Sequence, residues 1–212
     1  MGAKTWMLVY ADSDARESLC AQPKLDRAAT IQLAKRLFAN ERLEGLGDGD
    51  LSFTSPPDDE LHIGCFGGVS ILAAKEFGLD YPSALSHKFL EAGCTGKTYL
   101  HAMHSVVDWF AFAIWSSGKL TRSLSLSPDS GILEDIGDRL PFEVPFWSGQ
   151  CPAVDDGEDY PFPFHPLELA EATLHELFGY QIEGFTHAPR PPVEAEAIPL
   201  VRYKRLPSRS RL

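Results

Sequence analysis

The sequence predicts an α+β fold, a single domain in which helices pack on a mixed, mostly antiparallel sheet. Strand-like and helix-like segments alternate in the first half of the chain, and a β-hairpin follows in the centre. The chain has 212 residues, of which 44% are hydrophobic and 23% are charged. This composition supplies the core of one globular domain and excludes global disorder.

The first strand and the first helix are predicted from residues 5–38. Residues 5–11 are rich in Trp, Val and Tyr and predict a strand buried on both faces, which ends at Asp12-Ser13-Asp14. Residues 25–38 have apolar side chains at helical spacing opposite charged ones, and Asp26 favours the helix start through the dipole. The predicted apolar face of this helix consists of Leu25, Ala28, Ile31, Ala34, Leu37 and Phe38.

Residues 40–92 predict a connection, a second buried strand and two short helices. Turn residues dominate 40–50, so we expect a connection there that has room for one short strand. Residues 61–66 are apolar and predict a strand that Gly67-Gly68 breaks. Residues 69–77 and 83–92 have helical spacing, and each segment is followed by a glycine that favours a helix end.

The centre of the chain predicts a strand followed by a β-hairpin. Residues 97–104 predict the strand, and residues 108–115 and 119–127 predict the two arms of the hairpin. The turn between the arms is Ser116-Ser117-Gly118, which is typical of a hairpin connection.

The two-residue period of a strand assigns faces to both arms of the hairpin. Ser123, Ser125 and Ser127 share one face of the second arm, and Ala111 and Ala113 share one face of the first. If these faces adjoin, a shallow polar groove runs along the sheet. The register that decides this is not fixed by the sequence.

The last third of the chain predicts a long loop, a helix, a strand and a tail. Residues 141–166 contain six prolines and six aromatic residues, so we expect an irregular loop that packs on the body. Pro166 and Gly179 mark the start and the stop of a helix over 166–178, and residues 180–185 predict a last strand. We therefore expect a domain over 1–185 and a flexible, Pro-rich and basic tail over 186–212.

The charge and the cysteines restrict the class of protein. A formal net charge of −11 argues against binding to DNA or to an anionic membrane surface. The longest strongly apolar run, Trp109–Trp115, is far shorter than a membrane span. The four cysteines are widely spaced and form no C-x-x-C, which indicates reduced thiols and a cytoplasmic protein.

Two carboxylates at the end of the first predicted strand are candidate functional residues. Asp12 and Asp14 lie where acidic side chains often bind a hard cation such as Mg²⁺. The Asp-Ser-Asp sequence is also ordinary turn chemistry, in which side chains bond to nearby backbone groups. Both interpretations remain open at this point.

A histidine and aspartate cluster in the centre of the chain is the second candidate. His101, His104 and Asp108 are a metal-ligand set if they share one face, but on a strand His101 and His104 point to opposite sides. A bulge at Ser105-Val106 would reunite them. A metal site, a polar site without metal and structural hydrogen bonding are the alternatives, and we predict no metal as purified and no cofactor.

The sequence also predicts a location for a binding site. We expect the loop over 141–166 to lie over one end of the hairpin, because its aromatic side chains need apolar surface to cover. The site would lie between this loop and the strands over 97–104 and 119–127, near the three serines of the second arm. Asp129, in the turn after that arm, is a further candidate, although Pro-Asp-Ser-Gly is standard turn chemistry.

Several unusual sequence segments occur in order along residues 2–185, and with them the chain resembles a family of uncharacterised proteins from actinomycetes. The resemblance implies a free-standing cytoplasmic protein and no particular activity. The segments that carry it are Gly2–Thr5, Tyr10–Asp12, Leu25–Thr30, His101–Trp109, Arg122–Asp129, Glu134–Gly137 and Pro163–Leu169.

Two classes of function follow from these observations. The first is a binding domain for a small polar ligand or for a protein. The alternative is a small hydrolase or metal-dependent enzyme that uses Asp12, Asp14, His101, His104 and Asp108. An enzyme requires these groups to converge within a few ångströms in a pocket, whereas a binding domain requires only a cavity or groove.

Overall fold

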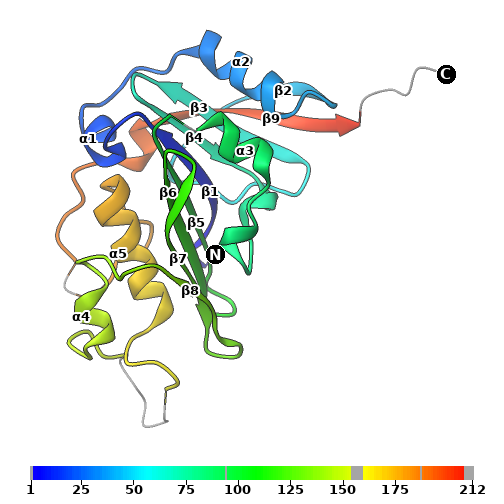
Figure 1. Cartoon of the computed structure of the whole chain (residues 1–212). Helices are drawn as coiled ribbons and strands as arrows, with labels where there is room; N and C mark the ends of the chain where they lie inside the picture. Colours follow the sequence, from blue (N-terminus) through cyan, green and yellow to red (C-terminus); the bar gives the residue numbers. More distant parts are fainter. Residues whose placement is uncertain (1, 94, 154–159, 187, 208–212) are drawn as a thin grey trace.

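In the computed structural model, the described residues form nine strands in one open, twisted sheet (Figure 1). The structure describes residues 2–93, 95–153, 160–186 and 188–207. All eight strand pairings are antiparallel, so the predicted α+β fold class is confirmed. From edge to edge the strands are β2 (Glu41–Asp50), β9 (Pro199–Pro207), β3 (Glu60–Phe66), β4 (Val69–Ala73), β1 (Lys4–Ala11), β5 (Lys97–His104), β6 (Trp109–Ser116), β7 (Lys119–Ser127) and β8 (Gly131–Ile136).

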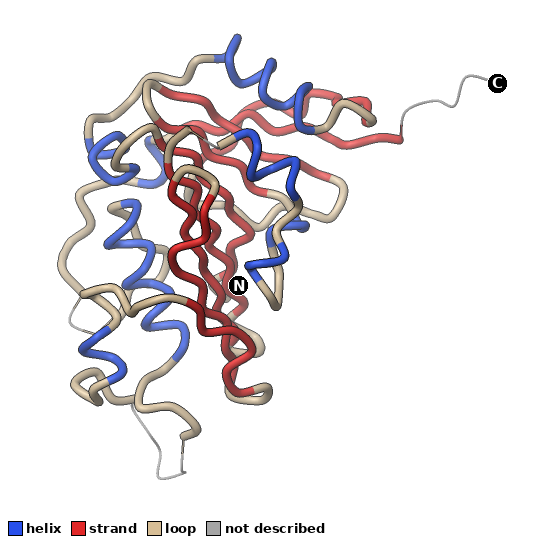
Figure 2. Tube along the Cα trace, viewed as in Figure 1, coloured by secondary structure: helices blue, strands red, loops and turns tan. Residues whose placement is uncertain are grey.

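Five α-helices of the described chain cover the two faces of the sheet, as Figures 1 and 2 show. The α5 face is covered by α1 (Ala15–Cys20), α4 (Val144–Trp147) and α5 (Pro166–Phe178). The α2 face is covered by α2 (Arg27–Leu37) and α3 (His87–Ala92). Three short 3₁₀ turns complete the fold: η1 (Lys75–Phe77), η2 (Pro82–Ala84) and η3 (Ala195–Ala197).

Each face has its own apolar core, because side chains alternate between the two sides of every strand. On β1, Met7 and Val9 belong to the core under α5, whereas Trp6 and Leu8 belong to the core under α2. The central strands are therefore buried on both sides, which explains why residues 5–11 are apolar without strict alternation.

Helix α5 has the bounds that its sequence signals predict. Pro166 occupies the first turn, and the Nδ1 atom of His165 accepts a hydrogen bond from the Leu167 N–H at 3.2 Å. Gly179 adopts a left-handed conformation with φ of +79°, which ends the helix. Leu174 is fully buried against the sheet, whereas Leu167 and Leu177 are half-buried.

Helix α2 also forms where the sequence predicts it, and its buried face is rotated from the expected one. The carboxylate of Asp26 accepts the Ala29 N–H at 2.9 Å and caps the helix. Ile31, which was expected in the core, is 42% exposed, and Leu33 is buried in its place.

Two other expected elements are wrong. Residues 69–77 were expected to be a helix, but β4 pairs with β3 through the tight turn at Gly67-Gly68, where Gly68 has φ of +82°. The β-branched residues Val69 and Ile71 suit this buried strand. Residues 180–185 form no strand, because the Glu171 carboxylate accepts the N–H groups of Ile182 and Glu183 at 2.9 and 3.0 Å.

The expected flexible tail over 186–212 is wrong for residues 199–207, since β9 lies inside the sheet between β2 and β3, and residues 187 and 208–212 lie outside the described residues. Residues 40–50 are correspondingly a ten-residue edge strand rather than a connection. The basic side chains of β9 pair with acids on neighbouring segments. The ion pairs are Arg202–Glu60 at 3.2 Å, Lys204–Asp59 at 2.5 Å, Arg205–Glu41 at 2.7 Å and Arg205–Glu76 at 2.6 Å.

The described parts of the loop over 141–166 pack on the α5 face and not on the serine face, which corrects the expected position. Phe142 approaches Phe112 with ring centroids 6.4 Å apart, and Phe146 meets Phe164 edge-on at 5.8 Å. The aromatic residues of the loop therefore cover the apolar side of the hairpin. Residues 154–159 of the loop lie outside the described residues.

Candidate functional site

The register of the hairpin confirms that the alanine and serine faces adjoin. Ala111 pairs with Ser125 and Ala113 pairs with Ser123. Both serines are fully buried, so this face forms part of the α2-side interior and not an open groove. The Ser123 hydroxyl hydrogen-bonds to Glu134, which also accepts the Ser83 N–H at 3.0 Å.

His101 lies on the α5 face, fully buried, and both of its ring nitrogens are hydrogen-bonded. Nε2 donates to the Ala170 carbonyl at 3.0 Å, and Nδ1 accepts from the Thr5 hydroxyl at 2.8 Å. Burial lowers the pKa of His101 to about 4, so the imidazole is neutral at pH 7. These contacts give His101 a structural role that joins β1, β5 and α5.

His104 lies on the opposite face of the sheet, beside Trp6, with ring centroids 5.9 Å apart. Asp108 is in the turn after β5, with φ of +46°, and its carboxylate is 3.7 Å from Nε2 of His165. The structure thus separates the three members of the predicted cluster. In the described ranges, no group of three or more His, Cys, Asp or Glu side chains is arranged to hold a metal ion.

Of the two N-terminal carboxylates, Asp14 takes the turn chemistry that was the alternative to metal binding. Asp14 caps α1, because its Oδ1 accepts the Glu17 N–H at 2.9 Å. Asp12 is exposed at the end of β1, and its backbone N–H donates to the Gly68 carbonyl at 3.0 Å. Neither residue lies with the central histidines.

One cavity brings together three of the residues singled out in the sequence, His104, Ser127 and Asp129. It has a volume of about 440 Å³ and lies on the α2 face, at the end of the sheet where β1 and β6 begin and β5 and β7 end. We call it the Trp6–Trp109 cavity. Its lining consists of Trp6, Lys75, Gly78, Asp80, Tyr81, His104, Val107, Trp109, Ser127, Asp129, Ser130 and Leu133.

Strand register explains how distant residues meet at this cavity. Lys4 pairs with His104, and His104 pairs with Trp109, so β1, β5 and β6 present their side chains in one row. The opposite wall is the segment from Gly78 to Ser83. Gly78 lies against the Trp6 ring, and the hydroxyl and N–H of Ser83 bond to Glu134 of β8. That segment therefore crosses the sheet from β1 to its edge.

Basic groups gather around Trp6 at one end of the cavity. The Nζ atoms of Lys75 and Lys4 lie 4.4 and 5.3 Å from the Trp6 ring centroid. The pKa of His104 is lowered, first by burial and then by the positive charges of Lys4 and Lys75. At pH 7 His104 is a neutral donor and acceptor beside two ammonium groups.

The middle of the cavity is apolar. The Trp6 and Trp109 rings are 5.9 Å apart, and Trp109 is 7% exposed. Its Nε1–H has no hydrogen-bond partner among the described residues. This nitrogen is buried, so the indole of Trp109 contributes apolar surface to the cavity.

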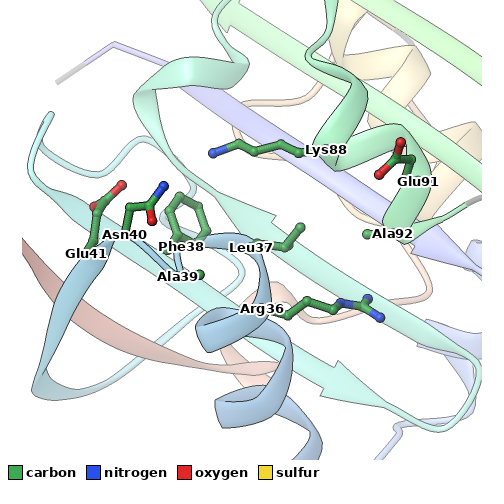
Figure 3. A pocket seen from close by; sticks show the side chains of 9 residues that line it. All are labelled: Arg36, Leu37, Phe38, Ala39, Asn40, Glu41, Lys88, Glu91 and Ala92. Atoms are coloured by element: carbon green, nitrogen blue, oxygen red, sulfur yellow. The ribbon is translucent and has the colours of Figure 1, made fainter.

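A second hollow, of about 430 Å³, lies between the end of α2 and α3 (Figure 3). Arg36 comes from α2, and Lys88 and Glu91 come from α3. The Lys88 ammonium packs over the Phe38 ring at 5.1 Å, and Glu41 is paired with Arg205 at 2.7 Å. Charged groups here stabilise the packing of α2, α3 and β9, and no residue singled out in the sequence lines this hollow.

Sequence reasoning missed most of the cavity lining, namely Trp6, Lys75, Asp80, Tyr81 and Trp109. The two tryptophans were interpreted as core residues, and Lys75 lies in a segment expected to be a helix. The register that aligns Lys4, His104 and Trp109, with Trp6 two residues along β1 on the same face, was the missing signal, because β1 and β5 are far apart in the chain.

Comparison with known proteins adds a family but no activity. A model described as a family of unknown function (DUF6928) matches residues 5–203, so the match includes most of β9. No curated protein and no solved structure matches the chain. No helix in the described part of the chain is long and apolar enough to cross a membrane.

Proposed function

The chain belongs to a family of unknown function, DUF6928, and we propose that it is a binding domain whose small-molecule ligand occupies the Trp6–Trp109 cavity. The single observation behind this proposal is the combination of apolar and polar groups in one hollow. Two indole rings and Leu133 offer apolar contact, while His104, Lys75 and Ser127 offer polar contact. Cavities of a few hundred Å³ with this mixture are typical of ligand sites.

The alternative of a hydrolase or metal-dependent enzyme has less support. It requires Asp12, Asp14, His101, His104 and Asp108 to converge, and these residues lie in separate places. A binding role requires no such convergence. We also place the protein in the cytoplasm, because the described cysteines Cys20, Cys65 and Cys151 are unpaired thiols, as is usual in a reducing compartment.

The proposal is tested by NMR with a mixture of small aromatic compounds. We expect some compounds to shift the indole N–H signal of Trp109. Trp147 is an internal control, because it packs against Phe164 on the other face of the sheet, with ring centroids 4.9 Å apart.

Substitutions of two adjacent residues in the turn between β5 and β6 test whether the compounds bind in the Trp6–Trp109 cavity. Val107 lines the Trp6–Trp109 cavity and is 46% exposed, so Val107→Trp should fill the cavity and abolish the Trp109 shifts. Val106 is 80% exposed and does not line this cavity, so Val106→Trp should leave the shifts unchanged. If no compound shifts Trp109, or if Val107→Trp binds as well as the wild type, the proposed function is wrong.

A further inference from the structure

The Trp6–Trp109 cavity is lined by side chains of opposite charge from different parts of the chain. Its basic end is at β1 and β5, where Lys75 lies over Trp6 and His104 packs beside that ring. Asp129 lines the same cavity from the turn after β7, together with Ser130. In the described chain, Lys75 and Asp129 are in no ion pair with another protein side chain.

The strand order separates these two ends. In the sheet, β1 is followed by β5, β6 and β7. The distance from β1 to β7 is therefore three strand spacings, or about 14 Å. The floor between them is formed by Trp109, and Tyr81 and Leu133 also line the cavity. Asp80 lines it from the crossing segment, between Gly78 over Trp6 and Ser83 at β8.

We propose that the ligand is an elongated zwitterion with a flat apolar body, its carboxylate at Lys75 and His104 and its ammonium group at Asp129. This inference rests on the proposed function and specifies the class of ligand. The lining has both signs of charge, so a ligand with only one charge would leave the opposite end of the cavity without a partner. The separation of the ends favours charges at opposite ends of the ligand over charges on one carbon.

The polar groups of the cavity suit this arrangement. Lys75 keeps N–H donors for a carboxylate while its charge interacts with the Trp6 ring. The Ser127 hydroxyl accepts the Ser130 N–H at 3.1 Å, which fixes the turn that holds Asp129.

Five benzene derivatives test the proposal by calorimetry and by the Trp109 indole shift. They are 3-[4-(aminomethyl)phenyl]propanoate, 3-phenylpropanoate, benzylamine, benzyl alcohol and phenylalanine, which respectively carry both charges at opposite ends, a carboxylate only, an ammonium only, no charge, and both charges on one carbon. We expect the first compound to bind tightest. Loss of either charge should weaken binding about fivefold, the scale of a partly exposed ion pair.

Charge variants assign the two ends. Lys75→Met should remove the advantage of the carboxylate, and Asp129→Asn should remove the advantage of the ammonium group, each about fivefold. Lys119→Met, at the start of β7 and so at the other end of the hairpin, and Asp138→Asn, outside the cavity lining, are the matched controls and should change neither preference.

The outcomes separate the inference from the proposed function. If the compounds shift Trp109 but bind equally, or if phenylalanine binds tightest, the zwitterion inference is wrong while the cavity remains a binding site. If the charge preferences persist in Lys75→Met and Asp129→Asn, the assignment of the two ends is wrong. If none of the five compounds shifts Trp109 and the aromatic mixture does not either, both proposals fail.

Discussion

His101 is held as a neutral imidazole by one hydrogen bond from each side of the ring. The Thr5 hydroxyl comes from a residue 96 positions earlier and the Ala170 carbonyl from one 69 positions later. A buried histidine with both nitrogens bonded is fully satisfied and has no lone pair left for a metal. His101 therefore resembles a metal ligand in the sequence, but in the fold its hydrogen bonds connect β5 to β1 and α5.

The depressed pKa of His101 predicts that stability falls as the pH falls from about 6.5 to about 4. In this window the unfolded state binds a proton that the folded state does not bind. The loss amounts to roughly 3 kcal/mol over the whole window. Urea unfolding at several pH values should therefore show a steeper dependence for the wild type than for His101→Gln.

A control for this experiment is His62→Gln, because burial also lowers the pKa of His62. Both variants should flatten the pH dependence, and His101→Gln should do so more, since the Glu60 carboxylate beside His62 partly opposes the lowering of its pKa by burial. An NMR titration in which the His101 ring protonates near pH 6.5 would contradict the prediction.

Elements whose sequence signals lie within a few adjacent residues were predictable, whereas elements that depend on pairing with strands far away in the sequence were not. Helix α5 has Pro166 at its start and Gly179 at its end, and the β6–β7 hairpin has a two-residue turn, so each could be assigned from a few adjacent residues. Strand β4 has only five residues, which is too short for its periodicity to distinguish a strand from a helix. The basic composition of β9 is typical of a tail, and its place in the sheet depends on pairing with β2 and β3, which lie far away in the chain.

Helix α5 contributes a large part of the core on its face, which predicts a stability cost for a cavity in it. Leu174 is fully buried, so Leu174→Ala should lower the free energy of unfolding by about 2–5 kcal/mol through lost transfer energy and an unfilled cavity. Leu177→Ala removes the same atoms at a half-buried position and should cost less. Urea denaturation measures both, and equal costs would show that the buried face of α5 is assigned incorrectly.

At the scale of the whole molecule, the candidate cavity is assembled from four separate segments. These are β1, the stretch from Lys75 to Tyr81, the β5–β6 region and the stretch from the end of β7 into β8. The sequence predicted the polar members His104, Ser127 and Asp129 individually. It could not predict their meeting with Trp6, because β1 pairs with β4 on one side and β5 on the other, and these partners are 60 to 100 positions along the chain.

The position of β9 predicts that the sheet is completed only when the end of the chain joins it. Among the described strands, β2 pairs with β9 alone, so removal of residues 199–212 would leave β2 without a partner and would expose an edge of β3. Leu200, fully buried in the core under α5, would also be lost. An exposed strand edge favours association between molecules, so we expect the truncated chain to be less stable and to aggregate.

A full-length variant distinguishes the effect of losing the strand pairing of β9 from the effect of losing its charges. Replacing Arg202, Lys204 and Arg205 by glutamine keeps the backbone pairing of β9 and removes its ion pairs, each of which is worth up to about 1 kcal/mol where it is partly exposed. This variant should stay monomeric with a moderately lower urea midpoint.

Hydrogen exchange on the wild type should show the amides of Val201–Lys204 as protected as those of β3, because both strands lie inside the sheet. Rapid exchange of those amides, together with an unchanged midpoint on truncation, would show that the last residues behave as a tail and that β3 is the edge of the stable sheet.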